Sequence, residues 1–280
     1  MRHYPFRLVN VFAESIFGGN PLCVFENGAG LSDIEMQQLA LQFNLSETTF
    51  ILPSTTATAR VRIFTPTFEM AFAGHPTLGS AHVVRDLMHA GNRLNLEMKV
   101  GVIPVTAEDS RWTLRAAAAA TREPAQSRAE LAEILGLSFD DVLDGALWVN
   151  TGSEQLIVPL ASVDAVRRTA PVAADFAKIS SNTARAMAYV FAENGEGKLL
   201  SRFFFRPNTS VVEDPGTGSA TANLGGWMIV QGRAPCKFAI EQGEAVGRPC
   251  HLGLQVTLDN AIFVSGGVIE IGRGTITLPS

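Results

Sequence analysis

Apolar and β-branched residues occur in short runs along the chain, and turns rich in glycine and proline separate these runs. Runs of this length and composition, bounded by turn residues, are typical of β-strands. Eight runs predict strands, and they span residues 6–12, 22–25, 45–52, 59–64, 148–151, 156–158, 187–192 and 202–205. After Cys236 the pattern predicts only short strands and glycine turns.

Helices are predicted where a capping residue precedes apolar residues at longer spacing. Ser32 and Ser127 each stand three residues before a glutamate, which is a capping box that opens a helix. Pro76 suits the first turn of a helix because its missing N–H would have no partner there. The predicted helices span about 33–43, 76–89, 172–180 and 222–230, and a further helix follows Ser127.

The two glycine-rich helix openings resemble each other. The segments 75–81 and 214–220 align without gaps at an offset close to half the chain (214 − 75 = 139), with proline, glycine, serine and alanine in register. Self-similarity at this distance predicts two lobes of like fold, although coincidence in a stretch of small residues is the alternative.

A helix N-terminus attracts anions through its unpaired N–H groups and its dipole. Two such termini in one cleft would hold a small carboxylate. The plainer alternative is that Gly79 and Gly218 only permit close helix packing. The strand pattern is lost over 115–124, which is the candidate crossing between the lobes.

Composition excludes several classes of protein. Hydrophobic residues make up 46% of the 280 residues, charged residues make up 18%, and the net charge is −5, so we expect a globular protein that does not bind nucleic acid. No uninterrupted apolar run is long enough to span a membrane. The three cysteines, Cys23, Cys236 and Cys250, have no metal-site spacing. We therefore expect a cytoplasmic protein with reduced thiols.

The sequence lacks the motifs that usually mark a metal site or a cofactor-binding site. His75, His82 and His89 recur every seven residues on one predicted helix, where neighbours lie about 10 Å apart, too far to share a metal. No phosphate-binding loop or nucleophile elbow is present, and none of the four lysines lies in a motif. We expect neither a metal nor a cofactor.

Four motifs in order resemble the PhzF family of phenazine-biosynthesis isomerases, which is built on the diaminopimelate epimerase fold. They are Gly19-Asn20-Pro21, the segment 44–50 (Asn-Leu-Ser-Glu-Thr-Thr-Phe), the segment 73–79 (Ala-Gly-His-Pro-Thr-Leu-Gly) and the segment 213–220 (Glu-Asp-Pro-Gly-Thr-Gly-Ser-Ala).

The resemblance implies an α/β (α+β) fold of two pseudo-symmetric lobes, each a curved, mostly antiparallel sheet around a central helix, with the active site between them. We expect lobes over 1–118 and 119–267, with a strand at about 268–280 returning to the first. The resemblance also implies a homodimer that works without metal or cofactor.

The resemblance also assigns roles to residues. The family's acid/base glutamate maps onto Glu47, its histidine onto His75 and its aspartate onto Asp214. The positions expected to bind substrate are Asn20, Gly74, Gly218 and Ser219. Epimerases on this fold use two cysteines, at positions corresponding to about Ala73 and Pro215 here, so a two-thiol racemase mechanism is not available to this chain.

The function expected from these residues is a cofactor-free proton shift between carbons of a small carboxylate, cyclic metabolites included. Glu47 would remove the proton and return one elsewhere, with Glu213 and Glu69 as lower-ranked acids. The alternative for Glu47 is a solvated loop carboxylate. Two other functions stay open: an amino- or hydroxy-acid epimerase or racemase, and a non-catalytic two-lobed protein that binds small carboxylates.

Overall fold

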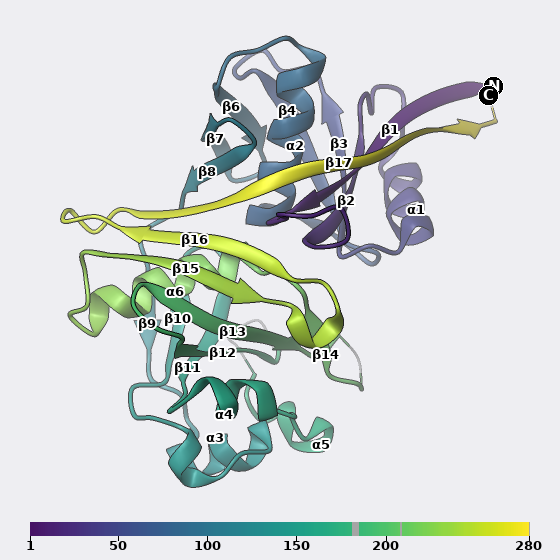
Figure 1. The fold of residues 1–280 in the computed structure, drawn as a ribbon. Helices are drawn as coiled ribbons and strands as arrows, with labels where there is room; N and C mark the ends of the chain where they lie inside the picture. The colour runs from purple at the N-terminus through teal and green to yellow at the C-terminus, as the bar shows by residue number, and fades with distance from the viewer. Residues whose placement is uncertain (181–184, 208, 280) are drawn as a thin grey trace. The chain divides into compact units, whose positions relative to one another are not determined.

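The computed structural model describes residues 1–180, 185–207 and 209–279. Residue 280, the end of the expected returning strand, lies outside the described residues. The chain forms two units, the first made of Met1–Arg115 with Ser265–Ser280 and the second made of Ala116–Val264. Most elements of both units are labelled in Figure 1, in which colour follows residue number from purple to yellow.

The first unit is a ring of strands around one helix. Its elements are β1 (Arg2–Val11), β2 (Asn20–Phe25), α1 (Asp33–Phe43), β3 (Glu47–Leu52), β4 (Ala59–Phe64), β5 (Glu69–Met70), α2 (Gly74–Leu87), β6 (Arg93–Met98), β7 (Gly101–Glu108), β8 (Arg111–Arg115) and, from residue 265, β17 (Ile262–Leu278). Strand pairing runs β1–β2–β3–β4–β6–β7–β8–β17 and returns to β1. Helix α2 contacts six of these strands and is buried along most of its length, so the ring encloses it.

Alternation along β3 explains how one sheet buries both its faces, because successive side chains of a strand point to opposite sides. The hydroxyl of Thr49 accepts a hydrogen bond from Ser80 of the central helix α2 at 2.9 Å. The next residue, Phe50, packs in a cluster with Phe25 and Met36, and Met36 belongs to α1. Helix α1 therefore covers the outer face of the sheet, and α2 fills the inner face.

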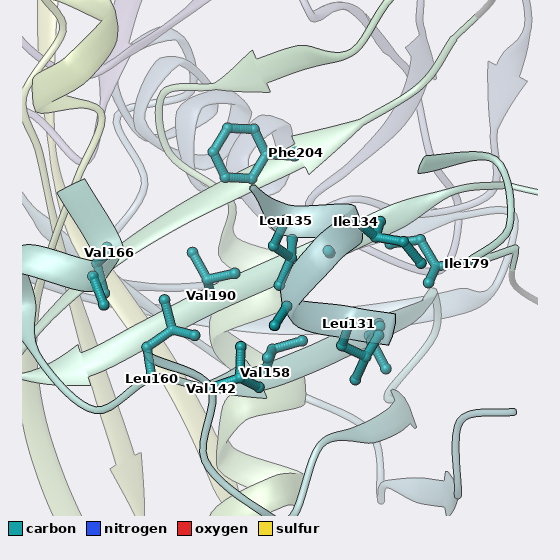
Figure 2. Close-up of a cluster of buried hydrophobic side chains, with 14 of the residues drawn as sticks. Leu131, Ile134, Leu135, Val142, Val158, Leu160, Val166, Ile179, Val190 and Phe204 are labelled. Atoms are coloured by element: carbon teal, nitrogen blue, oxygen red, sulfur yellow. The ribbon is translucent and has the colours of Figure 1, made fainter. Parts of the chain in front are cut away.

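The second unit repeats this plan. Its elements are β9 (Ala120–Arg122), α3 (Arg128–Leu135), the 3-10 helix η1 (Phe139–Asp141), β10 (Leu147–Asn150), β11 (Glu154–Pro159), α4 (Val163–Arg168), α5 (Ala173–Phe176), β12 (Met187–Glu193), β13 (Lys198–Phe205), β14 (Val212–Asp214), α6 (Gly218–Val230), β15 (Cys236–Gln242), η2 (Glu244–Val246) and β16 (Cys250–Val256). Helix α6 contacts β9, β10, β11 and β16. The apolar side chains of α3 and α4 pack on the strands, as Leu135, Val166 and Val190 show in Figure 2.

The two units share one order of strand pairing. From β1 to β7 the pairs alternate antiparallel, parallel, antiparallel, parallel, antiparallel, and the same alternation runs from β10 to β16. The central helices α2 and α6 follow the short strands β5 and β14. The mixed α+β fold expected from the sequence, with mostly antiparallel strands around a central helix in each repeat, is confirmed.

The register of the repeat differs from the one predicted from the sequence. Helix α2 begins at Gly74 and α6 at Gly218, an offset of 144 (218 − 74 = 144) rather than 139. His75 therefore matches Ser219, and Asp214 instead closes the strand before the helix. The gapless match compared a helix start with a turn, because small residues fill both segments.

Several helix and strand predictions differ in extent from the structure. Helix α2 ends at Leu87, and His89, which was placed in it, has a left-handed backbone (φ 48°). The helix expected over 172–180 is a single turn, Ala173–Phe176. The last strand, β17, runs for 17 residues instead of being short. No helix within the described ranges combines the length and apolarity that crossing a bilayer requires.

Candidate active site

Glu47 and His75 form a side-chain pair in the first unit. The imidazole Nδ1 of His75 lies 2.9 Å from the Glu47 carboxylate oxygen Oε2. The His75 side chain is 5% exposed and that of Glu47 is 16% exposed, so the pair is largely shielded while the carboxylate keeps access to solvent. The sequence placed both residues in the catalytic group, and the structure brings them into direct contact.

The local fold explains why these two side chains meet. Glu47 is the first residue of β3, and His75 is the second residue of α2, the helix that packs on β3. Asn20 opens β2, which runs parallel to β3 with Leu22 opposite Glu47. Asn20 is 1% exposed, so this predicted substrate-binding residue is buried beside the strand that carries Glu47.

The hydrogen bond defines where the proton of His75 lies. An ionised carboxylate can only accept, so Nδ1 carries the hydrogen when Glu47 is charged, and in a neutral imidazole Nε2 then holds a lone pair. That Nε2 atom is buried, and no partner for it exists in the part of the chain that the structure describes. Buried polar atoms normally have a partner, so Nε2 is a candidate ligand contact.

In the second unit, the carboxylate of Asp214 accepts a hydrogen bond from Thr217, and the side chain of Gln242 holds Thr217 in place. The Oγ1 of Thr217 donates to Oδ2 of Asp214 at 2.5 Å. The side chain of Gln242 accepts from the Thr217 backbone N–H through Oε1 and donates through Nε2 to the Thr217 hydroxyl, at 3.2 and 3.0 Å. Because a backbone N–H can only donate, it fixes the amide orientation, so the Thr217 hydroxyl must donate its own hydrogen to the carboxylate.

Ser219 takes part in a second polar chain of this unit. Its hydroxyl oxygen accepts a hydrogen bond from Nε2 of Gln155 at 2.9 Å. Oε1 of Gln155 in turn accepts from Nδ2 of Asn223 at 2.7 Å. Gln155 is 2% exposed and Asn223 is fully buried, so both amides are fixed inside the unit. Gly218, one residue before Ser219, is the first residue of α6.

The two lower-ranked acids are engaged in ion pairs. Glu69 receives two hydrogen bonds from Arg62, at 2.8 and 2.9 Å, and Glu213 receives two from Arg202, at 3.0 and 2.7 Å. The hydrogen bonds from Arg62 hold the pKa of Glu69 below its usual range. The lowered pKa makes Glu69 a poor proton carrier. Each ion pair joins a short strand, β5 or β14, to the strand that it pairs with.

The residues Thr217, Gln242, Gln155 and Asn223 were not predicted from the sequence. The available signal was polarity in an apolar setting, since Gln155 precedes the run Leu-Ile-Val of β11 and Asn223 lies in the apolar helix α6. A polar side chain at a core position needs a hydrogen-bond partner, and here these partners are other site residues.

The described part of the chain provides neither the paired thiols of a two-thiol mechanism nor the clustered ligands of a metal site. The helix N-caps that correspond in the two units are Ala73 and Thr217, and neither carries a thiol. Cys23 is fully buried, and burial raises the pKa of its thiol. Among the described residues, no three histidine, cysteine or acidic side chains cluster closely enough to hold a metal ion.

Comparison with known proteins gives consistent matches. The family model for phenazine biosynthesis-like proteins (PhzC-PhzF) matches residues 9–270. An uncharacterized isomerase of Pasteurella multocida is 40% identical over 99% of this chain and 95% of its own length. The trans-2,3-dihydro-3-hydroxyanthranilate isomerase of Pseudomonas chlororaphis is 35% identical over 99% of this chain and all of its own length.

A solved structure supports the fold. The crystal structure of a phenazine biosynthesis protein of the PhzF family from Bacillus anthracis superposes with a TM-score of 0.87. The match covers 99% of this chain and 100% of that one at 24% sequence identity. At that identity the likeness bears on the fold, and it agrees with the α+β architecture described above.

Proposed function

Because the chain belongs to the phenazine biosynthesis-like (PhzC-PhzF) family and is an isomerase, we propose that it moves a proton between two carbons of a small unsaturated carboxylate. Glu47 is the proposed acid and base. The observation that carries the proposal is the contact of 2.9 Å between Glu47 and His75. It distinguishes Glu47 from Glu69 and Glu213, which are bound to arginines.

The proposed reaction is redox-neutral. Glu47 takes a proton from a carbon next to a conjugated system, so the C–H bond breaks and its electron pair enters that system. The protonated carboxyl then delivers a proton to another carbon of the same system, and Glu47 returns to the carboxylate. Only the positions of one hydrogen and of the double bonds change, so no external oxidant or reductant is needed.

His75 is proposed to hold the carboxylate and to contact the substrate. Its Nδ1–H fixes the direction of Oε2, which leaves Oε1 of Glu47 to face the reacting carbon. The buried Nε2 is suited to accept a hydrogen bond from a hydroxyl or amino substituent of the substrate. A substrate group in this place would satisfy an imidazole nitrogen that otherwise stays unpaired.

Asp214 and Ser219 are proposed to bind polar groups of the substrate from the second unit. Thr217 supports the carboxylate of Asp214, and Gln155 supports the hydroxyl of Ser219. The proposed roles of Asn20, Gly74 and Gly218 are backbone or amide contacts at the openings of β2, α2 and α6. These roles agree with an asymmetric reaction, because β12, the counterpart of β3, begins with Met187 and carries no acid at Ala188.

The proposed substrate class is a ring carboxylate with a neighbouring amino or hydroxyl group. A relative that is 35% identical is named for trans-2,3-dihydro-3-hydroxyanthranilate, which has this chemistry. The carboxylate would suit a hydroxyl donor such as Ser219, and the ring substituents would suit the polar atoms of His75 and Asp214.

Hydrogen exchange in deuterated water tests this function. With trans-2,3-dihydro-3-hydroxyanthranilate as the probe, we expect the wild type to form an isomer that carries deuterium on carbon. Glu47→Gln should lower the rate by about 10²–10⁴-fold, the usual contribution of a general acid or base. Glu133→Gln, at an exposed position of α3, is the matched control and should keep the wild-type rate.

The outcome separates the three candidate functions. A non-catalytic binding protein would bind the probe without any exchange, and a racemase would exchange deuterium while inverting one stereocentre and leaving the double bonds in place. Full turnover by Glu47→Gln would refute the assignment of the base.

Two further properties are proposed with this function. A homodimer predicts a sedimentation mass of twice the 30.0 kDa chain. A reaction free of metal and cofactor predicts unchanged turnover after dialysis against a chelator, and loss of turnover would contradict that part of the proposal.

A further inference from the structure

The hydroxyl of Ser219 has a defined direction in the free protein. A hydroxyl offers one donor hydrogen and two acceptor lone pairs. Its oxygen lies 2.9 Å from Nε2 of Gln155, and no other side-chain or backbone partner of this hydroxyl occurs among the described residues. Whether Ser219 donates or accepts in this bond therefore depends on which end of the Gln155 amide faces it.

Backbone groups fix the neighbouring amide of Asn223 at both ends. Its Oδ1 accepts from the backbone N–H of Thr151 at 2.9 Å and from the Thr151 hydroxyl at 2.7 Å. Its Nδ2 donates to the backbone carbonyl of Ser153 at 2.8 Å. A backbone N–H cannot accept and a carbonyl cannot donate. A flipped Asn223 would therefore place its NH₂ group against the N–H of Thr151 and its oxygen against the carbonyl of Ser153.

The orientation of Asn223 then determines that of Gln155. Nδ2 of Asn223 also donates to Oε1 of Gln155 at 2.7 Å, so the other end of the Gln155 amide, the NH₂ group, must face Ser219. Both amides are buried, and a flip would leave buried polar groups without hydrogen bonds, which opposes it. The oxygen of Ser219 consequently accepts, and its hydrogen points elsewhere.

We propose that Gln155, itself fixed by Asn223, is a positioning residue that keeps the hydroxyl hydrogen of Ser219 available for donation to a carboxylate of the substrate. Serine alone could turn its hydroxyl either to donate or to accept. Because Gln155 donates to one lone pair of Ser219, the hydroxyl hydrogen points away from Gln155 and stays available to an anionic oxygen of a ligand. The identity of the ligand group as a carboxylate rests on the proposed function, whereas the direction of the hydroxyl does not.

A ligand-free measurement tests the direction of the hydrogen bonds. In protein with ¹⁵N-labelled glutamine and asparagine side chains, the NH₂ protons of Gln155 should show nuclear Overhauser effects to the Hβ protons of Ser219. The NH₂ protons of Asn223 should show them to Gln155. Effects from the Gln155 NH₂ to Asn223 in place of Ser219 would mean a flipped amide and would overturn the proposal.

A variant cycle tests the consequence for ligand binding, with anthranilate as the carboxylate probe and its dissociation constant as the readout. Gln155→Glu replaces the donor by an acceptor of the same shape, so Ser219 must turn its hydrogen inward. We expect the dissociation constant to rise at least tenfold. Gln155→Met, which removes the bond without reversing it, should raise it less than Gln155→Glu does.

The same change in a Ser219→Ala background controls for the added negative charge. The charge remains in that background, whereas the hydroxyl is gone, so Gln155→Glu should change the dissociation constant by less than about threefold. An equal fold-change in both backgrounds would show that Gln155 does not act through Ser219. If the wild type catalyses no proton exchange, the proposed function fails, and the labelled-amide measurement still decides the proposal made here.

Discussion

The hydroxyl of Thr217 donates its hydrogen to Oδ2 of Asp214 across 2.5 Å while its oxygen accepts from Gln242. Thr217 is also the N-cap of α6, although its side chain makes no capping hydrogen bond. Its hydroxyl is therefore committed to the aspartate and not to the helix. A hydrogen bond to a charged group contributes about 1.5–3 kcal/mol, so this bond is a substantial restraint on the carboxylate.

Replacing Thr217 by valine should impair the isomerase through Asp214. The valine keeps the shape of the side chain but removes the hydroxyl, so the hydrogen bonds from Thr217 to Asp214 and from Gln242 to the Thr217 hydroxyl are lost. We expect kcat/KM to fall by about tenfold or more, in line with the strength of a charge-assisted hydrogen bond. Thr217→Ser, which keeps the hydroxyl, should retain most of the wild-type kcat/KM, and equal values for the valine and wild-type proteins would contradict this role of Thr217.

Two substitutions of His75 separate the functions of its two ring nitrogens. Asparagine can place an N–H where Nδ1 lies and keep the hydrogen bond to Glu47, whereas glutamine reaches the place of Nε2 and loses that bond. Because the Glu47 contact carries the proposed chemistry, we expect H75N to keep a higher kcat than H75Q. Single-turnover deuterium exchange measures both, and the opposite order would show that Nε2 contributes more than the contact with Glu47.

Local chemistry made some elements predictable from the sequence. Ser32 and Ser127 form the two capping boxes that were expected, with each serine hydroxyl accepting from the backbone N–H of the glutamate three residues on. Strand β4 has the predicted bounds, Ala59–Phe64. These signals act within a few residues, so the sequence contains all that is needed to interpret them.

Tertiary contacts decided the features that the sequence did not predict. Gln155 meets Ser219 across 64 positions of chain, and Gln242 meets Thr217 across 25. Neither of these sequence separations follows from the short-range periodicity of a helix or a strand. The repeat was misaligned for the same reason, since the matched helix starts are defined by strand pairing and not by the small residues that both segments share. Glu47 and His75 were found through their motifs, and their contact required the structure.

The pH dependence of stability should change when Asp141 is replaced by asparagine. Hydrogen bonds from Arg168 and from Ser138 lower the pKa of Asp141 to about 2, against about 3.9 for an aspartate in an unfolded chain. A group whose pKa is lowered on folding stabilises the native state above its unfolded pKa, and this stabilisation is lost as the pH falls towards about 2.

Urea unfolding at pH 5 and at pH 2.5 measures the effect of Asp141. The urea concentration at the midpoint of unfolding should fall more between pH 5 and pH 2.5 for the wild type than for D141N, in which the titrating group is absent. D140N alters a neighbouring exposed aspartate and should behave like the wild type. A D141N profile as steep as that of the wild type would show that Asp141 contributes nothing to acid lability.

Replacing Gly79 by alanine should destabilise the first unit, although alanine is the better helix former by about 1 kcal/mol. Gly79 lies inside α2, and a Cβ atom there would stand 2.5 Å from Cδ2 of Leu22 and 2.9 Å from Cγ2 of Val11. Both neighbours are fully buried, so neither can move into solvent. Overpacking of a core typically costs about 1–3 kcal/mol, which outweighs the gain in helix propensity.

The substitution G79A should also lower activity, because the side chain that it displaces belongs to the strand next to Glu47. Leu22 lies opposite Glu47 in the parallel pair β2–β3, and α2 carries His75. A shift between helix and strand would lengthen the contact between Glu47 and His75. Urea unfolding and deuterium exchange measure the two effects, with G91A as the control because a Cβ at Gly91 meets no atom within 4 Å. Wild-type stability and turnover in G79A would show that this helix packs with more tolerance than its contacts indicate.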